Sequence, residues 1–204
     1  NRRHIVVSDQ SGRANILARF RDIGPEIDPG DPKVGSLVET VKAREYDGYA
    51  YDGAEASFEL LARRALGSVP EYFGTVRFGE LVTESEATIT LEVGGSRRMT
   101  VANGNGPVNA LDTAMRKALL EVYPALSDMR LVDYKVRILT PGDGTGAVTR
   151  VMIESADADG ARWSTVGVSP NIIDASFSAL FDGITWKLMR DGVAPSVAAA
   201  TPAA

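Results

Sequence analysis

The sequence contains no cysteine and a single histidine, His4, among its 204 residues. Without cysteine there is no disulfide framework, no thiolate zinc site and no cysteine nucleophile. One histidine cannot build a zinc site that needs several. Gly167 and Ser169 form half of a nucleophile elbow, but no histidine follows them in the chain to complete a catalytic triad. The sequence therefore predicts neither hydrolase chemistry nor a metal site in this chain.

Basic residues and long apolar runs are also scarce. The chain has 22 Lys and Arg against 27 Asp and Glu, a net charge of −5 that supplies no basic surface for nucleic acid or an anionic membrane. No apolar run approaches the roughly 20 residues that cross a bilayer, and "NRRHIVVSDQ" lacks a signal peptide's apolar core and a starting methionine. We expect no nucleic-acid or membrane partner, and a cytoplasmic chain that is compatible with a piece of a longer protein.

The first 69 residues show helical spacing interrupted by turn-forming residues. Ser11 precedes the helical segment "GRANILARFRDIG", and the Pro- and Gly-rich "GPEIDPGDPKVGS" then predicts a loop. Helical spacing resumes in "LVETVKAREYDG" and in "AEASFELLARRALG", which Gly67 ends. We predict small helical linker subdomains over 1–69.

Beyond Pro70 the hydrophobic period changes from helical to alternating. In "ATITLEVGG" the apolar residues occupy every second position, which predicts a half-buried strand ending in a Gly-Gly turn. Its neighbours "TVRFGELVTE" and "RRMTVANG" are predicted antiparallel partners, because their connections are short. The helix that follows carries an apolar stripe made of Leu111, Ala114, Met115, Ala118, Leu119 and Val122.

The same order of elements then recurs. "LVDYKVRILT", "AVTRVMIESAD" and "ARWSTVG" are predicted strands, and "SPNIIDASFSALFDGITWKLM" is a predicted helix. We predict an α+β fold of duplicated βββα units with pseudo-twofold symmetry, since two such units can complete each other's core. The predicted regulatory domain spans 70–191, with repeats at about 70–126 and 127–191, and 192–204 is a predicted flexible tail.

The two helix entrances, "GNGPVNALDTA" and "GVSPNIIDASF", resemble each other in their Gly, Pro, Asn and Asp. The first is no phosphate loop, because Pro107 follows Gly106 where Lys would stand and Asn109 replaces a third glycine. Two interpretations stay open. Pro107 and Pro170 fit first helical turns, so both helices simply begin there. Alternatively, the paired entrances present backbone amides to the carboxylate of a small acid or amino acid.

Other acidic residues carry weaker signals. "DADG", from Asp157 to Gly160, has only the start of a calcium loop and is a better candidate for a hairpin turn. No motif in the sequence marks Asp9, Glu55 or Glu59 as a general base, so we interpret them as solvated.

Six ordered motifs together resemble a known family: "SDQSGRAN", "DGAEASFELL", "GNGPVNALD" with the following "RKAL", "DYKVRIL", "GTGAVTRVMIES" and "TVGVSPNIIDASFSAL". The chain from about Arg3 to Arg190 resembles the C-terminal half of the citramalate synthase branch of the 2-isopropylmalate synthase family. The resemblance implies a full enzyme that condenses acetyl-CoA with a 2-oxo acid in a metal-dependent TIM barrel. No segment here matches that barrel, so we expect no catalytic residue, cofactor or divalent-metal ligand in this chain and no activity from it alone.

The resemblance further implies a linker followed by a regulatory domain that binds a feedback inhibitor at a homodimer interface. The effector would be isoleucine in the citramalate branch or leucine in the isopropylmalate branch, and the other partner is the catalytic barrel. A purely structural dimerisation module is the alternative. Effector roles carry over to Asn103, Gly104, Asn105, Gly106, Pro107 and Asn109, to Gly167, Val168, Ser169, Pro170, Asn171 and Ile172, and to Asp133 and Tyr134 between the repeats. Signalling roles carry over to Ser11, Arg13 and Asn15 in the linker. Our hypothesis is that amides at both helix starts hold the effector carboxylate while Ile172 and Val108 enclose its alkyl group.

Overall fold

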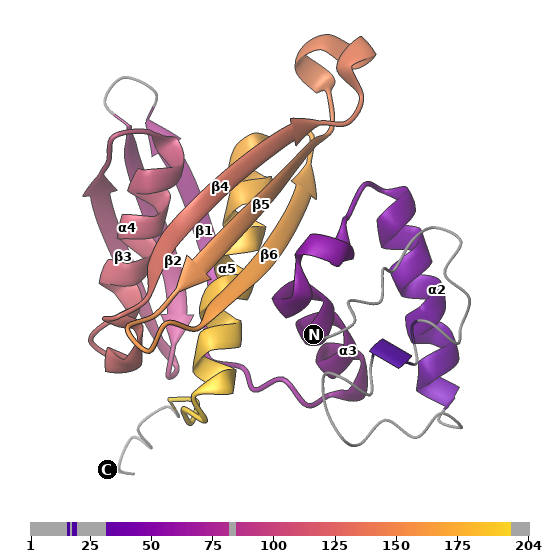
Figure 1. Cartoon of the computed structure of the whole chain (residues 1–204). Coiled ribbons are helices and arrows are strands. Elements are labelled where there is room, and N and C mark those ends of the chain that lie inside the picture. Colours follow the sequence, from indigo (N-terminus) through magenta and orange to yellow (C-terminus); the bar gives the residue numbers. More distant parts are fainter. Residues whose placement is uncertain (1–15, 17, 20–31, 82–84, 197–204) are drawn as a thin grey trace. The chain divides into compact units, whose positions relative to one another are not determined.

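The computed structural model describes residues 16, 18–19, 32–81 and 85–196 (Figure 1). The chain divides into two compact units, each built from segments that are distant in sequence. The first unit comprises 1–69, 131–156 and 161–183, and the second comprises 70–130, 157–160 and 184–204. Within the described residues, no helix is long and apolar enough to span a membrane.

The second unit contains the first predicted sheet and its helix. Strands β1 (Gly74–Leu81), β2 (Glu86–Val93) and β3 (Ser96–Asn103) form an antiparallel sheet in that order, and α4 (Pro107–Leu119) packs on β2 and β3. A short 3-10 turn, η2 (Pro124–Leu126), follows. The alternation predicted for β2 is confirmed, because its apolar residues Ala87, Ile89, Leu91 and Val93 are buried.

The first unit contains most of the second sheet. Strands β4 (Arg130–Ile138), β5 (Thr149–Ala156) and β6 (Arg162–Ser169) form the order β4-β5-β6, and η3 (Pro141–Gly146) connects β4 to β5. The predicted DADG turn is confirmed between β5 and β6, where Gly160 has a φ of 82° and donates its N–H to the Asp157 carbonyl at 3.3 Å. Helix α5 (Ile172–Arg190) belongs to the first unit as far as Gly183 and to the second from Ile184.

Helices of the linker region complete the first unit. These are α2 (Pro32–Tyr46), η1 (Tyr51–Gly53) and α3 (Glu55–Leu66), and α3 ends at Gly67 with a φ of 73°, as predicted. The loop predicted through Ser36 is wrong in its second half, because α2 already begins at Pro32. Proline is tolerated in a first helical turn, where its missing N–H would have no intrahelical acceptor.

A hydrophobic core joins these helices to the outer face of the second sheet. The largest buried side chains in it are Tyr51, on η1, and Phe58, on α3. Val166, on β6, lies in the same core, and Met152 and Val168 pack against it. The linker helices therefore cover one face of the sheet while α5 covers the other.

A hydrogen bond repeated in both units confirms the duplicated βββα arrangement. Thr100 Oγ1, on β3, donates to the Ala114 carbonyl of α4 at 2.8 Å, and Thr165 Oγ1, on β6, donates to the Ala179 carbonyl of α5 at 2.8 Å. The two contacts are 65 residues apart at both ends, so Pro107 corresponds to Ile172 rather than to Pro170. The match between the two prolines is therefore wrong. The pseudo-twofold axis and the domain boundaries stay predictions.

Candidate functional site

The entrance to α4 lies in the second unit and folds back on the helix. Asn109 Oδ1 accepts the N–H of Asn105 at 3.1 Å, and Gly104 donates its own N–H to the Ser85 carbonyl at 3.0 Å. A side chain at Gly104 would have its Cβ 2.7 Å from Asn109 Oδ1 and 2.8 Å from the Cα of Ala110. Only glycine fits that close approach, so the first role of Gly104 and Asn109 is to shape this loop.

The same entrance offers unused backbone donors. Gly106 precedes the helix in an extended conformation, with a φ of 177° and no side-chain cap, and Pro107 has no N–H. Ala110 donates to the Gly106 carbonyl at 3.0 Å, which leaves the earlier N–H groups of Val108 and Asn109 without an intrahelical acceptor. No acidic residue lies in the first turn, so the positive end of the helix dipole is uncompensated and favours an anion.

The entrance to α5 lies in the first unit and is capped differently. Asn171 Oδ1 accepts the N–H of Ile173 at 2.9 Å, and Ser169 Oγ accepts the N–H of Asn171 at 3.0 Å. Asn171 is thus the N-cap, and the expectation that Pro170 stands in the first turn is wrong. Asp174 lies exposed in the first turn, where its negative charge makes this entrance less suited to a carboxylate than that of α4.

Gly167 allows β6 to approach α5 closely. A Cβ at this position would lie 2.9 Å from the carbonyl carbon of Ala175 and still nearer to its oxygen. These are backbone atoms of α5 and cannot rotate away. Gly167 therefore sets the distance between β6 and the first turns of α5.

Tyr134, from β4, also reaches the α5 entrance. Its hydroxyl lies 3.0 Å from Ser176 Oγ, and Ser176 donates to the Ile172 carbonyl at 2.6 Å. Asp133 is engaged by Lys135 at 2.5 Å and by the N–H of Tyr134 at 2.9 Å, and the hydrogen bond from Lys135 lowers the pKa of its carboxyl. Of the two candidates between the repeats, Tyr134 contacts α5 and Asp133 is held by its own strand.

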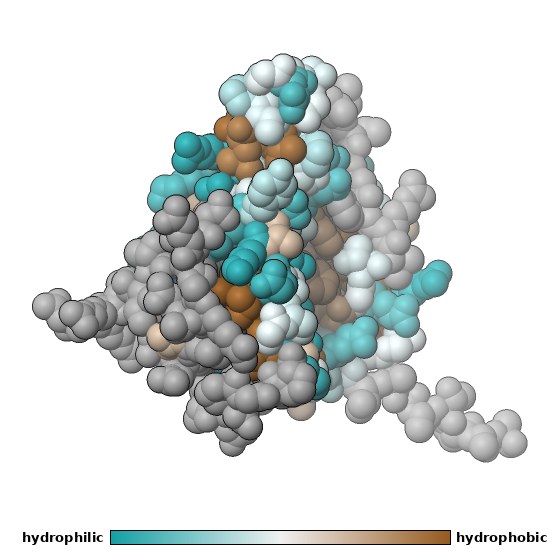
Figure 2. Space-filling model, turned by 90° about the vertical axis from the view of Figure 1, so that its right-hand side faces the viewer, coloured by the Kyte–Doolittle hydropathy of each residue, from teal (hydrophilic) through white to brown (hydrophobic). Residues whose placement is uncertain are grey.

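Apolar side chains are exposed at the end of the second sheet that leads into α5. Figure 2 shows hydrophobic surface among polar residues on the face it views. The end of β4 adjoins the start of β5, where the Leu139 N–H donates to the Val148 carbonyl at 2.8 Å. The start of β5 in turn pairs with the end of β6, which leads into α5. Val136 is 43% exposed, Ile138 57% and Ile172 41%.

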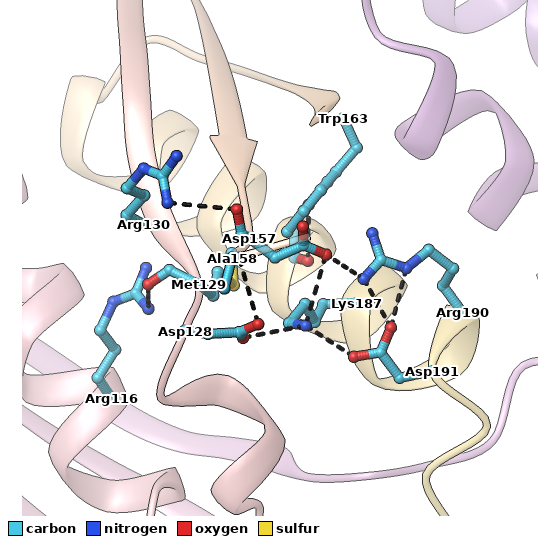
Figure 3. A network of polar contacts seen from close by, with 11 residues as sticks. Arg116, Asp128, Met129, Arg130, Asp157, Ala158, Trp163, Lys187, Arg190 and Asp191 are labelled. Atoms are coloured by element: carbon cyan, nitrogen blue, oxygen red, sulfur yellow. Dashed lines mark hydrogen bonds and ion pairs between the residues drawn. The ribbon is translucent and has the colours of Figure 1, made fainter. Parts of the chain in front are cut away.

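A buried charge network in the second unit escaped the sequence analysis (Figure 3). Lys187 Nζ lies 2.7 Å from a carboxylate oxygen of Asp191, 3.1 Å from Asp128 and 3.7 Å from Asp157, and its side chain is only 4% exposed. Arg190 pairs with both Asp157 and Asp191. Burial lowers the pKa of Lys187, but hydrogen bonds to Asp191 and Asp128 outweigh it, and the pKa is raised.

The network fixes the turn between β5 and β6 to the end of α5. Asp157, interpreted from the sequence as an ordinary turn residue, is fully buried at the centre of these contacts. The spacing of Lys187 and Asp191, four residues apart on a helix, was the only available signal, and it did not identify the distant partners. No group of three or more His, Asp or Glu side chains in the described part of the chain is placed to hold a metal.

The signalling candidates Ser11, Arg13 and Asn15 lie outside the described residues. The effector candidates of the two repeats fall in different units, so the structure shows each entrance by itself. At the α5 entrance it brings Tyr134 together with the segment from Gly167 to Ile172.

The two sheets with their helices define this protein as an α+β domain of duplicated βββα units, in which each helix begins at a polar entrance. The chain belongs to the family described as the LeuA allosteric (dimerisation) domain, whose sequence model matches residues 53–188.

Relatives refine that placement. The chain is 48% identical over 198 residues to the (R)-citramalate synthase of Geobacter sulfurreducens and 46% identical over 199 residues to that of Aquifex aeolicus. These matches cover 93% and 94% of this chain but only 37% and 38% of the relatives' length. The 2-isopropylmalate synthase of Aquifex aeolicus is 38% identical over 104 residues, which is 51% of this chain and 18% of that protein.

Proposed function

We propose that this chain is the feedback-inhibition domain of a citramalate synthase-like acyltransferase and that it binds isoleucine as a homodimer. The observation that carries the proposal is the similarity to (R)-citramalate synthases over more than nine tenths of the chain. The family is one of allosteric dimerisation domains, and an allosteric domain requires a ligand with different affinity for two states. In this proposal the condensation of acetyl-CoA with pyruvate, and the divalent metal it uses, belong to the rest of a cytoplasmic enzyme.

The polar ends of an amino acid match the two entrances taken separately. The free N–H groups of Val108 and Asn109 and the uncompensated α4 dipole suit the effector carboxylate. The exposed carboxylate of Asp174, in the first turn of α5, suits the effector ammonium group. We therefore propose that each entrance by itself favours a different group, a carboxylate at α4 and an ammonium at α5, in place of two equivalent carboxylate sites.

The effector alkyl group matches the α5 end of the second sheet. Val136, Ile138 and Ile172 are exposed there beside Tyr134, so an apolar ligand would remove their surface from water. Burying about 100 Å² of apolar surface contributes roughly 2.5 kcal/mol. This is enough to distinguish a branched amino acid from alanine.

The first test is calorimetric titration of the purified chain with isoleucine, then leucine, then valine, with the oligomeric state measured at the same concentration. We expect saturable binding to a dimer with isoleucine preferred. A preference for leucine would assign the chain to the isopropylmalate branch, to which half of it is also similar. A folded dimer that binds none of the three would leave a structural dimerisation module.

Variants then locate the site. Ile138→Ala removes apolar surface beside the α5 entrance and should weaken effector binding about tenfold, since losing most of a branched side chain forfeits roughly 1–2 kcal/mol of burial. Met99→Ala is the matched control, because Met99 is 72% exposed on β3 and belongs to neither entrance. Asn109→Ala and Asn171→Ala should both reduce affinity by loosening the loops they hold. Unchanged affinity in all three entrance variants would contradict the assignment.

A further inference from the structure

The outer edge of the second sheet is closed by a side chain from the linker region. β6 is an edge strand in the order β4-β5-β6, so alternate backbone N–H groups along it have no strand partner. The N–H of Val166 donates instead to Ser57 Oγ, on α3, at 3.0 Å. Ser57 is 4% exposed, and its sequence separation from Val166 is 109 residues. An edge hydrogen bond of the sheet is thus made by the linker helix.

The same serine reaches the middle of α5. Ser57 Oγ donates to Asp182 Oδ2 at 3.0 Å, and Asp182 Oδ1 lies 2.8 Å from Arg64 Nη1. The Asp182 side chain is 16% exposed, and burial raises its pKa although Arg64 and Ser57 act in the opposite direction. We call Ser57, Arg64 and Asp182, with the Val166 N–H, the α3 clasp. All of it lies within the first unit.

The clasp occupies a particular position along α5. Asp182 lies ten positions after Ile172, where the helix begins beside the proposed effector surface. Beyond Asp182 the helix enters the second unit, where the network around Lys187 holds its end. An α-helix is stiff over this length, so a shift of its first turns is passed along the helix to Asp182.

The position of β6 also depends on α5, because at Gly167 the two backbones lie very close together. The strand backbone touches the backbone of Ala175, and the next residue before it in the chain, Val166, donates to Ser57. A movement of the α5 entrance would therefore act on both hydrogen bonds of Ser57, on one through the strand and on the other through the helix. Two hydrogen bonds on one small side chain thus connect α3 to both β6 and α5.

We propose that the α3 clasp is the point at which the effector-binding end of α5 is coupled to the linker helices. The inference rests on the proposed function, because it assigns a route to a signal that begins with effector binding. The residues of the clasp are positioning residues and do not contact the effector. Coupling between two sites is a free energy that links binding at one to a change at the other. A variant without the clasp should therefore still bind the effector, but binding should no longer affect α3.

The test is hydrogen exchange of the purified full chain, read by mass spectrometry on peptides covering 55–66, with and without saturating isoleucine. We expect isoleucine to slow exchange across α3 by at least threefold in the wild type. In Ser57→Ala and Asp182→Asn, calorimetry should still show saturable isoleucine binding, whereas the slowing in α3 should fall below half of the wild-type effect. Asp182→Asn keeps the shape of the side chain but removes the charge that pairs with Arg64 and that strengthens the hydrogen bond from Ser57, so it serves if Ser57→Ala does not fold.

The matched control is Asp112→Asn. Asp112 is 15% exposed and pairs with Arg116 on α4 at 2.9 Å, so the change removes a similar half-buried carboxylate outside the clasp. It should retain the full effect of isoleucine on α3. Saturable binding without any change in wild-type α3, or undiminished slowing in both clasp variants, would overturn the clasp while leaving the proposed function intact. Absence of binding to the wild type would overturn both.

Discussion

Replacing Gly167 with alanine should separate β6 from α5 and lower stability markedly. The added Cβ would lie 2.9 Å from the carbonyl carbon of Ala175 and nearer to its oxygen, whereas carbon atoms in ordinary contact are about 3.5–4.0 Å apart. Neither backbone can rotate away, so strand and helix must move apart by about 1 Å or more. Overpacking of this kind typically costs about 1–3 kcal/mol, and backbone contacts on both sides place Gly167 at the upper end.

A cost of about 3 kcal/mol corresponds to a fall in Tm of roughly 6–12 °C for a chain of this size. Thermal unfolding followed by circular dichroism measures it, with Gly142→Ala as the control because a Cβ there meets nothing within 4 Å. The control should melt at or slightly above the wild-type temperature, since alanine restricts the unfolded chain. If Gly167→Ala melted within 1 °C of the control, β6 and α5 would not be in the close contact described here.

Three further changes test the network and the α5 entrance. Lys187→Met leaves buried carboxylates with one cation fewer and should lower the free energy of unfolding, measured in urea, by about 3–5 kcal/mol. Lys42→Met changes an exposed ion pair and should leave the free energy of unfolding unchanged. Equal stabilities of the two variants would contradict the burial of the network. Burial raises the pKa of Asp128, but hydrogen bonds from Lys187 and the Ala158 N–H outweigh it, and the pKa is lowered in the folded chain. The stability that Asp128 contributes is therefore present above its unfolded pKa and is lost as pH falls through its folded pKa. Asp128→Asn should therefore lose less stability than the wild type below about pH 4, and parallel pH profiles would refute this. Tyr134→Phe removes the hydroxyl contact with α5, so it should lower the free energy of unfolding by about 1 kcal/mol and weaken effector binding. Thermal melting and calorimetry measure the two effects. Tyr46→Phe, at an 86% exposed position, should change neither.

Helix entrances show how far local patterns reach. The pattern of Pro and Asn correctly predicted that helices begin near 107 and 170, because those residues have strong local preferences. It did not identify which residue caps the second helix. Asn171 takes that role and Pro170 stays outside, which makes the two entrances unlike in charge and capping. Their correspondence became visible only through Thr100 and Thr165, whose hydrogen bonds join a strand to a helix.

The effector candidates could be proposed from sequence because they cluster in short recognisable motifs. Val136 and Ile138 could not be proposed as effector contacts from the sequence, because alternation on a strand predicts that such residues are buried. Their exposure depends on how much of the strand is covered by other elements, which is a property of the assembled sheet.

The sequence by itself determined the elements of this protein and their order. Alternation defined the strand from Glu86 to Val93, helical spacing defined α3 and α4, and Gly-Gly and Asp-Gly pairs defined turns, since these are preferences of neighbouring residues. Only the tertiary structure decided which charges are buried and what they contact. Asp157, Asp182 and Lys187 are ordinary turn or helix residues along the chain, and each has partners brought together from segments far apart in sequence. Burial and pairing depend on those long-range contacts, which no local pattern encodes.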